Sequence, residues 1–153
     1  MHLRATAKVK LKADSGQTLV EFAIAAIVFL LLIFAVIDFS FLFFTKLTLQ
    51  NAVRQGGRYA ITGQAMPSKT RYASILQTIE NHGMGFAVDS NTTICSALKG
   101  CTSAGGPGDT VTITVTYTYK FITPLVGAFF TGGAYTFSVS TSFKNEPFPP
   151  SET

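Results

Sequence analysis

The amino-acid sequence predicts an α+β protein in which one long N-terminal helix packs on a small antiparallel β-sheet. Three observations predict this architecture. A long apolar run begins at Phe22, a helical spacing of apolar residues continues it to Thr62, and two stretches of alternating residues follow in the last third of the chain. The 153 residues are enough for one ordinary domain and a membrane segment.

The chain begins with a polar, basic segment, residues 1–16, that has no apolar periodicity. Its basic side chains outnumber the single acidic one and supply most of the net charge of +4. A secretory signal peptide has an apolar core of about 7–15 residues followed by a small-residue cleavage site. Here the apolar run is longer and no such site follows, so we expect it to be retained as an anchor. The rest of the chain is nearly neutral and does not indicate nucleic-acid binding.

The apolar run has the length of a membrane helix. Residues 22–37 contain no charged or strongly polar side chain. Asp38 interrupts the run, which then resumes over residues 39–44. About 22 residues at about 1.5 Å each reach about 33 Å, which is enough to cross a bilayer core. We therefore expect a transmembrane segment at about residues 22–44, within one helix that spans residues 17–63.

Beyond the membrane the same helix becomes amphipathic. Its apolar residues fall on one face and its polar and basic residues on another. The Gly56-Gly57 pair weakens the helix and indicates either a bend or a close helix contact. Gly63 is a natural end. Such a helix is about 65 Å long, so its outer half must pack on something.

We expect residues 64–146 to form an extracytoplasmic α+β domain, followed by a flexible proline-rich tail at residues 147–153. A second helix is expected at residues 69–82, where the apolar residues share one face. Alternation of apolar and small polar residues predicts two long strands, 109–121 and 134–143, which we expect to pair antiparallel.

Shorter elements fill the rest of this domain. Residues 92–95 are a candidate strand, and the composition of residues 102–108 predicts a loop. Residues 124–130 are expected to form a short apolar helix or a turn.

The two cysteines of the chain, Cys95 and Cys101, both lie beyond the membrane run. If that part of the chain is outside the cytoplasm, we expect a disulfide that closes a short loop. The alternative is two free thiols in a reducing compartment.

The sequence gives no indication of catalysis. After Gly16 the chain holds one histidine, His82, and it has no nucleophile elbow, zinc-protease motif, phosphate-binding loop or carboxylate cluster. Two cysteines and one histidine do not have the spacing of a zinc site. We therefore expect a protein that is not an enzyme, with no catalytic residue, no cofactor, no metal and no small-molecule substrate.

Two acids interrupt the apolar helix. Glu21 lies at the mouth of the span, where an acid is costly, and we expect it to act in processing or assembly. A side chain that simply extends to the headgroups is the alternative. Asp38 is expected either to sit at the outer membrane interface or to contact another subunit in a platform or filament. The two acids are about 100° apart around the helix and do not share a face.

Two basic residues, Arg54 and Arg58, lie four positions apart on one face of the outer helix. We expect them to form an interaction face. They either pair with acids of the sheet or are solvated.

Taken together, these segments resemble the TadE-like family of pseudopilins from tight-adherence (Tad, type IVb) pilus systems. The segment Gly16–Ala23, GQTLVEFA, matches the family's G-x-x-x-x-E-F-A start, and Asp38-Phe39 matches an acidic residue and an aromatic at the far end of the span. The segment 51–60, NAVRQGGRYA, follows the family's N-A-A-R-x-G-A-R-Y-A pattern, with Gly57 in place of the commoner alanine. The resemblance extends to the C-terminal part of the chain, through the strand 111–119, residues 123–125 and residues 144–146, and so covers nearly the whole chain.

This resemblance implies a pilin-like fold and a cleaved leader. A membrane prepilin peptidase is expected to cut after Gly16, since a glycine there lets an extended backbone enter a tight cleft. The cut removes residues 1–16 and creates an α-amine on Gln17, where many type IV pilins have Phe. Glu21 is then one helical turn away on the same face. Its expected partner is the terminal amine of a neighbouring subunit or that of its own chain.

The resemblance further implies a minor pilin or pseudopilin of a Tad pilus assembly or secretion machine, which contributes to pilus biogenesis and surface adhesion. The major pilins of such systems are much shorter, so the sheet domain favours a minor role. The implied partners are the prepilin peptidase, other pilin or pseudopilin subunits, the inner-membrane assembly platform and the lipid bilayer. The alternative is an unprocessed single-span membrane protein whose outer domain binds a ligand or partner.

The implied location is the bacterial inner (cytoplasmic) membrane, with the N-terminus in the cytoplasm and the C-terminal domain outside, and incorporation into an extracellular pilus is a further option. Four basic residues precede the span, and Lys46, Arg54 and Arg58 follow it. The positive-inside rule therefore favours this orientation only weakly, and the leader motif carries the prediction.

Overall fold

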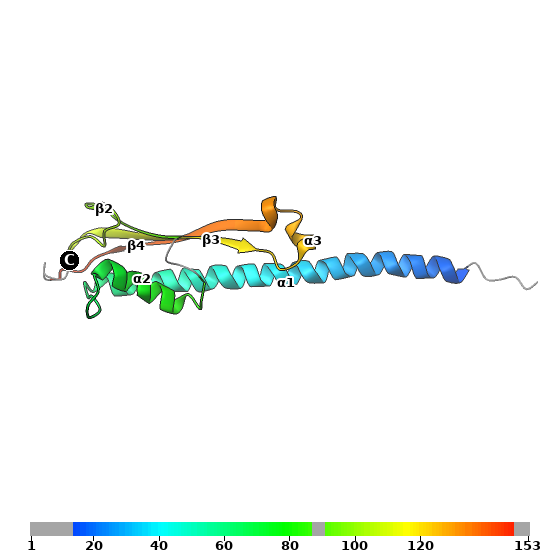
Figure 1. The fold of residues 1–153 in the computed structure, drawn as a ribbon, viewed down its shortest axis with the longest axis horizontal. Coiled ribbons are helices and arrows are strands. Elements are labelled where there is room, and N and C mark those ends of the chain that lie inside the picture. Colours follow the sequence, from blue (N-terminus) through cyan, green and yellow to red (C-terminus); the bar gives the residue numbers. More distant parts are fainter. Residues whose placement is uncertain (1–13, 87–90, 149–153) are drawn as a thin grey trace, which may run out of the picture.

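The computed structural model describes residues 14–86 and 91–148, and it has the predicted α+β architecture. A single helix, α1 (Asp14–Ile61), runs the length of the molecule, and the remaining elements lie along its C-terminal half (Figure 1). The N-terminal half of α1 extends alone. The outer part of the molecule is therefore a domain built on one end of a long rod.

Helix α1 is continuous through Gly56 and Gly57, so these glycines mark close contacts and not a bend. A Cβ atom on Gly56 would lie 2.2 Å from Cγ1 of Ile79, and one on Gly57 would lie 1.7 Å from the ring of Phe143. Because neither contact leaves room for a side chain, the two glycines let a second helix and a strand approach α1 on adjacent faces. The helix ends before Gly63, as predicted, where the backbone turns to a φ of +71°.

The sheet has four antiparallel strands in the order β2-β1-β3-β4. The long strands β3 (Thr110–Lys120) and β4 (Ala134–Lys144) pair along their whole length, from Thr110 opposite Lys144 to Lys120 opposite Ala134. This confirms the predicted antiparallel pair. Strand β1 (Thr92–Ser96) also agrees with the sequence, whereas the two-residue strand β2 (Gly100–Cys101) was not predicted.

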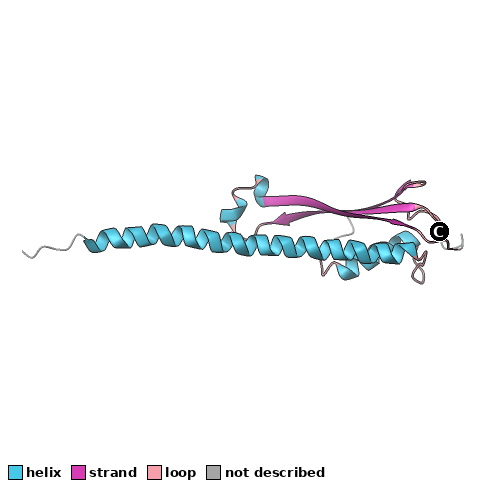
Figure 2. Cartoon of the chain, turned by 180° about the vertical axis from the view of Figure 1, so that it is seen from behind, coloured by secondary structure: helices cyan, strands magenta, loops and turns pink. Residues whose placement is uncertain are grey.

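Among the described residues, the domain also contains a second α-helix and two shorter helical turns. Helix α2 (Arg71–His82) begins two residues later than predicted, because the side chain of Thr70 caps it by accepting a hydrogen bond from the backbone N–H of Ala73. Helix α3 (Pro124–Gly127) and the 3-10 turn η2 (Thr131–Gly133) form the connection between β3 and β4. Figure 2 shows this connection beside the middle of α1, at the opposite end of the sheet from the C-terminus.

The core lies where the sheet covers the outer half of α1. Alternate residues of β3 point inward, as their spacing predicted, and meet fully buried residues of α1 and α2. The members of this core that have no exposed surface are Leu49, Ala52, Ala60, Ile75, Ile79, Ile94, Val111, Ile113 and Val115.

The predicted flexible tail begins too early. Phe148 is buried, and its ring lies 4.5 Å from the guanidinium carbon of Arg71 and against Gly63. The prediction rested on the proline-rich composition of this segment, and composition does not show that one aromatic residue packs on the domain. Residues 149–153 lie outside the described residues, as do residues 1–13 of the predicted leader.

Candidate functional site

The first candidate site is the exposed N-terminal half of α1. Its large apolar side chains are open to the surroundings from Leu19 to Ile37, and the chain itself supplies no cover for the most apolar stretch. A helix that is apolar on all sides and this long is typical of a membrane span. The structure thus contains a candidate membrane span near the N-terminus, by length and composition.

At the start of this span, Gly16 and Gln17 lie within the first turns of α1. Together with Val20, Glu21 and Ile24 they outline one shallow, open surface. The residues predicted for cleavage and for assembly are therefore adjacent on the helix. A protease binds an extended backbone, so cleavage requires the first turns to unwind. Unwinding there costs little, because the end of a helix lacks part of its hydrogen bonds.

Glu21 is exposed, and in the described part of the chain no basic side chain pairs with it. A carboxylate at this position is one turn from the N-terminal end of the helix that cleavage after Gly16 would create. The positive end of the helix dipole favours a negative charge there. Its remaining hydrogen-bonding capacity is open to a partner from another molecule.

Asp38 lies in a different environment from either of those that the sequence predicted. The side chain is fully buried inside its own chain, so it is exposed neither to headgroups nor to a second subunit. Its carboxylate accepts hydrogen bonds from the backbone N–H of Ile122 at 2.9 Å, from the backbone N–H of Thr123 at 3.2 Å and from the hydroxyl of Thr123. The donors come from a loop 84 residues further along the chain, which the local sequence around Asp38 does not reveal.

These bonds hold the connection between β3 and β4 against α1. The phenol of Tyr119 adds a longer contact, 3.4 Å, to the backbone carbonyl of Asp38. Burial raises the pKa of this phenol, and repulsion from the carboxylate of Asp38 and from Tyr117, once that phenol ionises, raises it further. Asp38 is therefore a structural residue that attaches the outer domain to α1.

The predicted interaction face at Arg54 and Arg58 is solvent-exposed. Both side chains line a shallow groove between α1 and β4, together with Asn51, Gln55, Thr141 and Phe143. Over residues 14–86 and 91–148 no acid of the sheet pairs with either guanidinium. The sequence left two alternatives, pairing with acids of the sheet or solvation, and the structure shows both arginines solvated.

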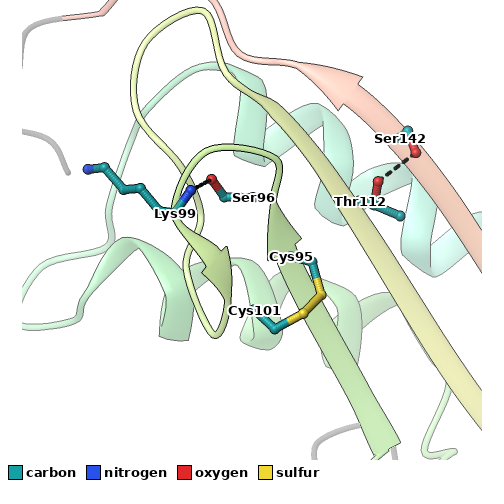
Figure 3. The surroundings of a disulfide bond; sticks show 6 residues. All are labelled: Cys95, Ser96, Lys99, Cys101, Thr112 and Ser142. Carbon is teal, nitrogen blue, oxygen red and sulfur yellow. Dashed lines mark hydrogen bonds between the residues drawn. A yellow bond between two sulfur atoms is a disulfide. The ribbon is translucent and has the colours of Figure 1, made fainter.

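The predicted disulfide between Cys95 and Cys101 is present. The two cysteines lie directly opposite each other on β1 and β2, and Figure 3 shows the bond closing the hairpin between these strands. Within the hairpin the backbone N–H of Lys99 donates to the hydroxyl of Ser96 at 2.8 Å (Figure 3). The disulfide therefore stabilises a tight turn at the end of the domain furthest from the candidate span.

Arg71 is a residue that sequence reasoning missed. Its guanidinium is buried and donates to the backbone carbonyls of Ala60 at 2.6 Å and Gly105 at 2.7 Å. Burial lowers the pKa of this guanidinium below its usual value. The side chain joins the end of α1, the start of α2 and the loop before β3. The sequence around it shows only a basic residue at the start of a helix, and nothing local marks it as buried.

No cluster of metal-binding side chains is present among the residues that the structure describes. A partly open cavity of about 210 Å³ lies between α1 and the connection from β3 to β4. Its lining is aromatic and aliphatic except for one lysine, and it presents no nucleophile or acid–base pair. It gives the protein an apolar contact surface and no set of reactive groups.

Comparison with known proteins gives a match to one protein family. The family described as TadE-like protein matches residues 16–58, from the predicted cleavage site to the second arginine. No curated protein matches the chain. No solved structure matches it either.

The family match stops before the outer domain. The likeness expected in the C-terminal part of the chain, at residues 111–119, 123–125 and 144–146, is not part of it and stays a prediction. The matched segment includes the leader junction, the candidate span and the arginine segment. Residues 16–58 of this chain are TadE-like, which confirms the predicted resemblance and associates the protein with the machinery of Tad pili.

Proposed function

We propose that this protein is a minor pilin or pseudopilin of a Tad (type IVb) pilus assembly or secretion machine, released from its leader by a prepilin peptidase that cuts after Gly16. One observation carries the proposal. The apolar part of α1 contains two acids. Asp38 is buried and accepts hydrogen bonds from its own chain, whereas Glu21 is exposed and unpaired within the described residues. Glu21 is thus the acid left for a partner in another molecule.

The cleavage step depends on residues at the helix start. The basic leader stays in the cytoplasm, and Gly16 presents a backbone without a side chain to the peptidase. Hydrolysis of the peptide bond between Gly16 and Gln17 adds water across it and leaves a carboxylate on Gly16 and an amine on Gln17. At neutral pH this α-amine is largely protonated, since its usual pKa is about 7.7–8.0.

The new ammonium group and Glu21 then complement each other. An unpaired carboxylate at the edge of a bilayer is costly, and pairing it with a cation in a low-dielectric environment offsets that cost. A subunit that docks with its α-amine near the Glu21 of a neighbour gains this pairing at the moment of assembly. The exposed apolar half of α1 supports the same model, because neighbouring helices can pack along it.

The outer domain supports a minor role in the assembly. It is held to α1 by Asp38, by the core under the sheet and by the Arg71 bonds, so that it projects from the rod in a fixed orientation. The groove that contains Arg54 and Arg58 faces away from this core and is open to an acidic surface of another subunit. We further propose that the protein has no enzymatic activity of its own and acts through these contacts.

The mature N-terminus tests the proposal. Mass spectrometry of the protein purified from cells that make working pili is expected to find Gln17 as the first residue, methylated or not. Recovery of the chain with its leader intact from such cells would overturn the proposal.

A substitution tests the role of Glu21 separately. The Glu21→Ala variant is expected to impair cleavage or to block assembly, with loss of pili on the cell surface. The matched control is Glu80→Ala, which removes an exposed acid from α2 and should leave piliation unchanged. Normal piliation in the Glu21→Ala variant would contradict the role given to this residue.

A second candidate function is an unprocessed single-span membrane protein whose outer domain binds a ligand or partner. The cavity beside α1 favours it, as does the absence of a family match over the outer domain. An intact leader in membranes that contain an active prepilin peptidase would support this second function.

A further inference from the structure

The segment that connects β3 to β4, residues 121–133, is here called the α3 lobe. Its sequence, FITPLVGAFFTGG, contains no charged residue, and the nearest charges along the chain are Lys120 and Lys144. Three large apolar side chains point outward from it. Ile122 is 62% exposed, Leu125 48% and Phe129 77%. Three large exposed apolar side chains within one short uncharged segment are unusual for a surface that faces water.

The inner face of the lobe is well packed. The rings of Phe121 and Phe130 stack with their centroids 4.3 Å apart, and both contact the ring of Phe39 on α1 edge to face. The lobe is therefore fixed to the helix on one side. Its exposed apolar residues belong to a defined second surface and are not a consequence of loose packing.

The hydrogen bonds from Ile122 and Thr123 to Asp38 set the position of the lobe along α1. Asp38 lies six residues before Phe44, the end of the apolar run, which is about 9 Å along the helix axis. Exposed apolar residues of α1 continue at this level, with Phe41, Phe43 and Phe44. Figure 1 shows α3 next to the middle of α1, at the end of the sheet that faces the candidate span. Whatever apolar medium surrounds this part of α1 therefore also reaches the lobe.

Most backbone N–H groups of the lobe find an acceptor within the chain, which lowers the cost of placing this segment in hydrocarbon. Pro124 has no N–H, and Ile122 and Thr123 donate to Asp38. Most of the other N–H groups of the lobe donate to carbonyls within it, namely those of Phe121, Gly127, Ala128, Phe129, Phe130 and Gly133. This arrangement also explains the burial of Asp38, because an unpaired acid at this depth would be costly.

We infer that the α3 lobe is immersed in the outer leaflet of the bilayer that α1 spans, as a second membrane contact of the protein. The side chains around the lobe change from apolar to polar in the direction from the bilayer centre to the headgroups. The apolar cavity between lobe and helix is lined at its inner end by Phe39 and Leu42 and has Lys46 as its one charged residue, four positions further out. Lys46, Lys120 and Tyr135 are exposed next to the lobe, and in this arrangement their polar ends extend to the headgroups. This inference rests on the membrane anchoring in the proposed function and not on pilus assembly.

Tryptophan fluorescence tests the inference, because the chain contains no tryptophan. Single tryptophans are placed by Phe129→Trp in the lobe, Ile27→Trp in the span and Leu98→Trp in the hairpin between β1 and β2. Leu98 is 83% exposed at the far end of the sheet and is the matched control. The full-length variants are reconstituted at one copy per nanodisc in phospholipids brominated on the acyl chains, and quenching by bromine is measured.

The Phe129→Trp variant is expected to be quenched several-fold more than Leu98→Trp, and with bromines near the headgroups more than with bromines near the bilayer centre. A second lobe variant, Leu125→Trp, should behave in the same way. Equal quenching of the lobe and hairpin variants, with Ile27→Trp strongly quenched, would overturn the inference and leave the anchoring intact. If Ile27→Trp is also not quenched, α1 does not span the bilayer, and the inference fails together with the anchoring.

Varying the number of copies per nanodisc distinguishes a lobe that contacts lipid from one that contacts another protein subunit. With lipid as the cover, the blue-shifted emission of the Phe129→Trp variant is expected at a single copy per disc. A blue shift that appears only when several copies share a disc would show that the lobe contacts another subunit, and would overturn the inference.

Discussion

The two halves of α1 are both rich in apolar residues, yet they have different surroundings. In the inner half, from Leu19 to Ile37, large apolar side chains are exposed. In the outer half, the apolar residues on one face are buried beneath the sheet and α2, and Leu49 and Ala52 have no exposed surface. The comparison teaches that an apolar pattern predicts that a helix is shielded from water. The pattern does not indicate whether protein or lipid shields it. The chain covers the outer half itself and leaves the inner half, the candidate membrane span, without a cover of its own.

The change from one half to the other takes place between Asp38 and Leu42. Asp38 is the first fully buried side chain of α1, and Leu42 the first buried apolar one. The outer domain thus contacts α1 before the predicted end of the membrane span at residue 44. This overlap places the α3 lobe beside the outer end of the candidate span.

A matched pair of leucines on the same helix provides the largest expected contrast. The Leu49→Ala variant empties a fully buried site and should lower the free energy of unfolding of the outer domain by about 2–5 kcal/mol. The Leu32→Ala variant removes a side chain that is 59% exposed and should leave that free energy unchanged. Urea unfolding in detergent, followed by the circular dichroism of the sheet, measures both. Equal effects of the two substitutions would show that the halves do not differ as described.

The two acids of α1 offer a second contrast. In the Asp38→Ala variant two backbone N–H groups and the Thr123 hydroxyl lose their acceptor, which should cost about 3 kcal/mol of outer-domain stability. The Glu21→Ala variant should have no such cost, because Glu21 makes no contact with the outer domain, and its effect should appear in cleavage or assembly alone. The same unfolding measurement applies. A loss of stability in the Glu21→Ala variant, or none in Asp38→Ala, would contradict the division of roles.

The disulfide gives a smaller effect at the other end of the domain. Replacing Cys95 and Cys101 by alanine together removes a short covalent loop and should lower stability by about 2 kcal/mol. The loss should be confined to the β1–β2 hairpin, since the bond lies far from α1. Hydrogen exchange followed residue by residue checks this, with faster exchange expected in the hairpin and unchanged exchange in β3 and β4. Faster exchange along the whole sheet would show that the bond supports more than the hairpin.

Much of the fold follows from local patterns in the sequence. The alternation in β3 and β4, the apolar spacing of α2 and the uninterrupted apolar run of α1 each report on the surroundings of neighbouring residues, so a single segment contains the information. The disulfide was predictable for the same reason, since its cysteines are only six residues apart. At the leader junction, Gly16, Gln17 and Glu21 form a local motif as well.

The parts that sequence reasoning missed depend on partners far apart in the chain. Asp38 reads as an acid near a membrane boundary, and its true partners are 84 residues away. Arg71 binds carbonyls on two other segments, and Phe148 packs on Arg71 from the end of the described chain. No periodicity encodes such contacts, because they depend on how the elements are placed in space. They are also the contacts that attach the outer domain to the rod.

The smallest expected effect concerns Tyr119, whose phenol lies at the junction between the two halves. Its pKa is raised above the usual 10.0, first by burial and then by the charge of Asp38. A raised pKa favours the neutral phenol in the folded state, so its contribution to stability is fully present below about pH 10 and is lost as the pH rises through the higher, folded-state pKa. The wild-type protein should therefore lose more stability above pH 10 than the Tyr119→Phe variant, whereas below pH 10 the two should be nearly equal, since the phenol makes only the long contact to Asp38.

The measurement is the free energy of unfolding of both proteins as a function of pH, and their difference cancels the titration of the other groups. A third protein separates the two causes. The Asp38→Asn variant removes the charge and keeps one acceptor oxygen. Because burial is the larger cause, this variant should retain most of the loss of stability above pH 10 that Tyr119 produces. If this loss disappears in Asp38→Asn, the charge and not the burial controls the phenol. Identical pH profiles for the wild type and Tyr119→Phe would show that this side chain is open to water, and that the junction between membrane helix and outer domain is less closed than the packing around Asp38 indicates.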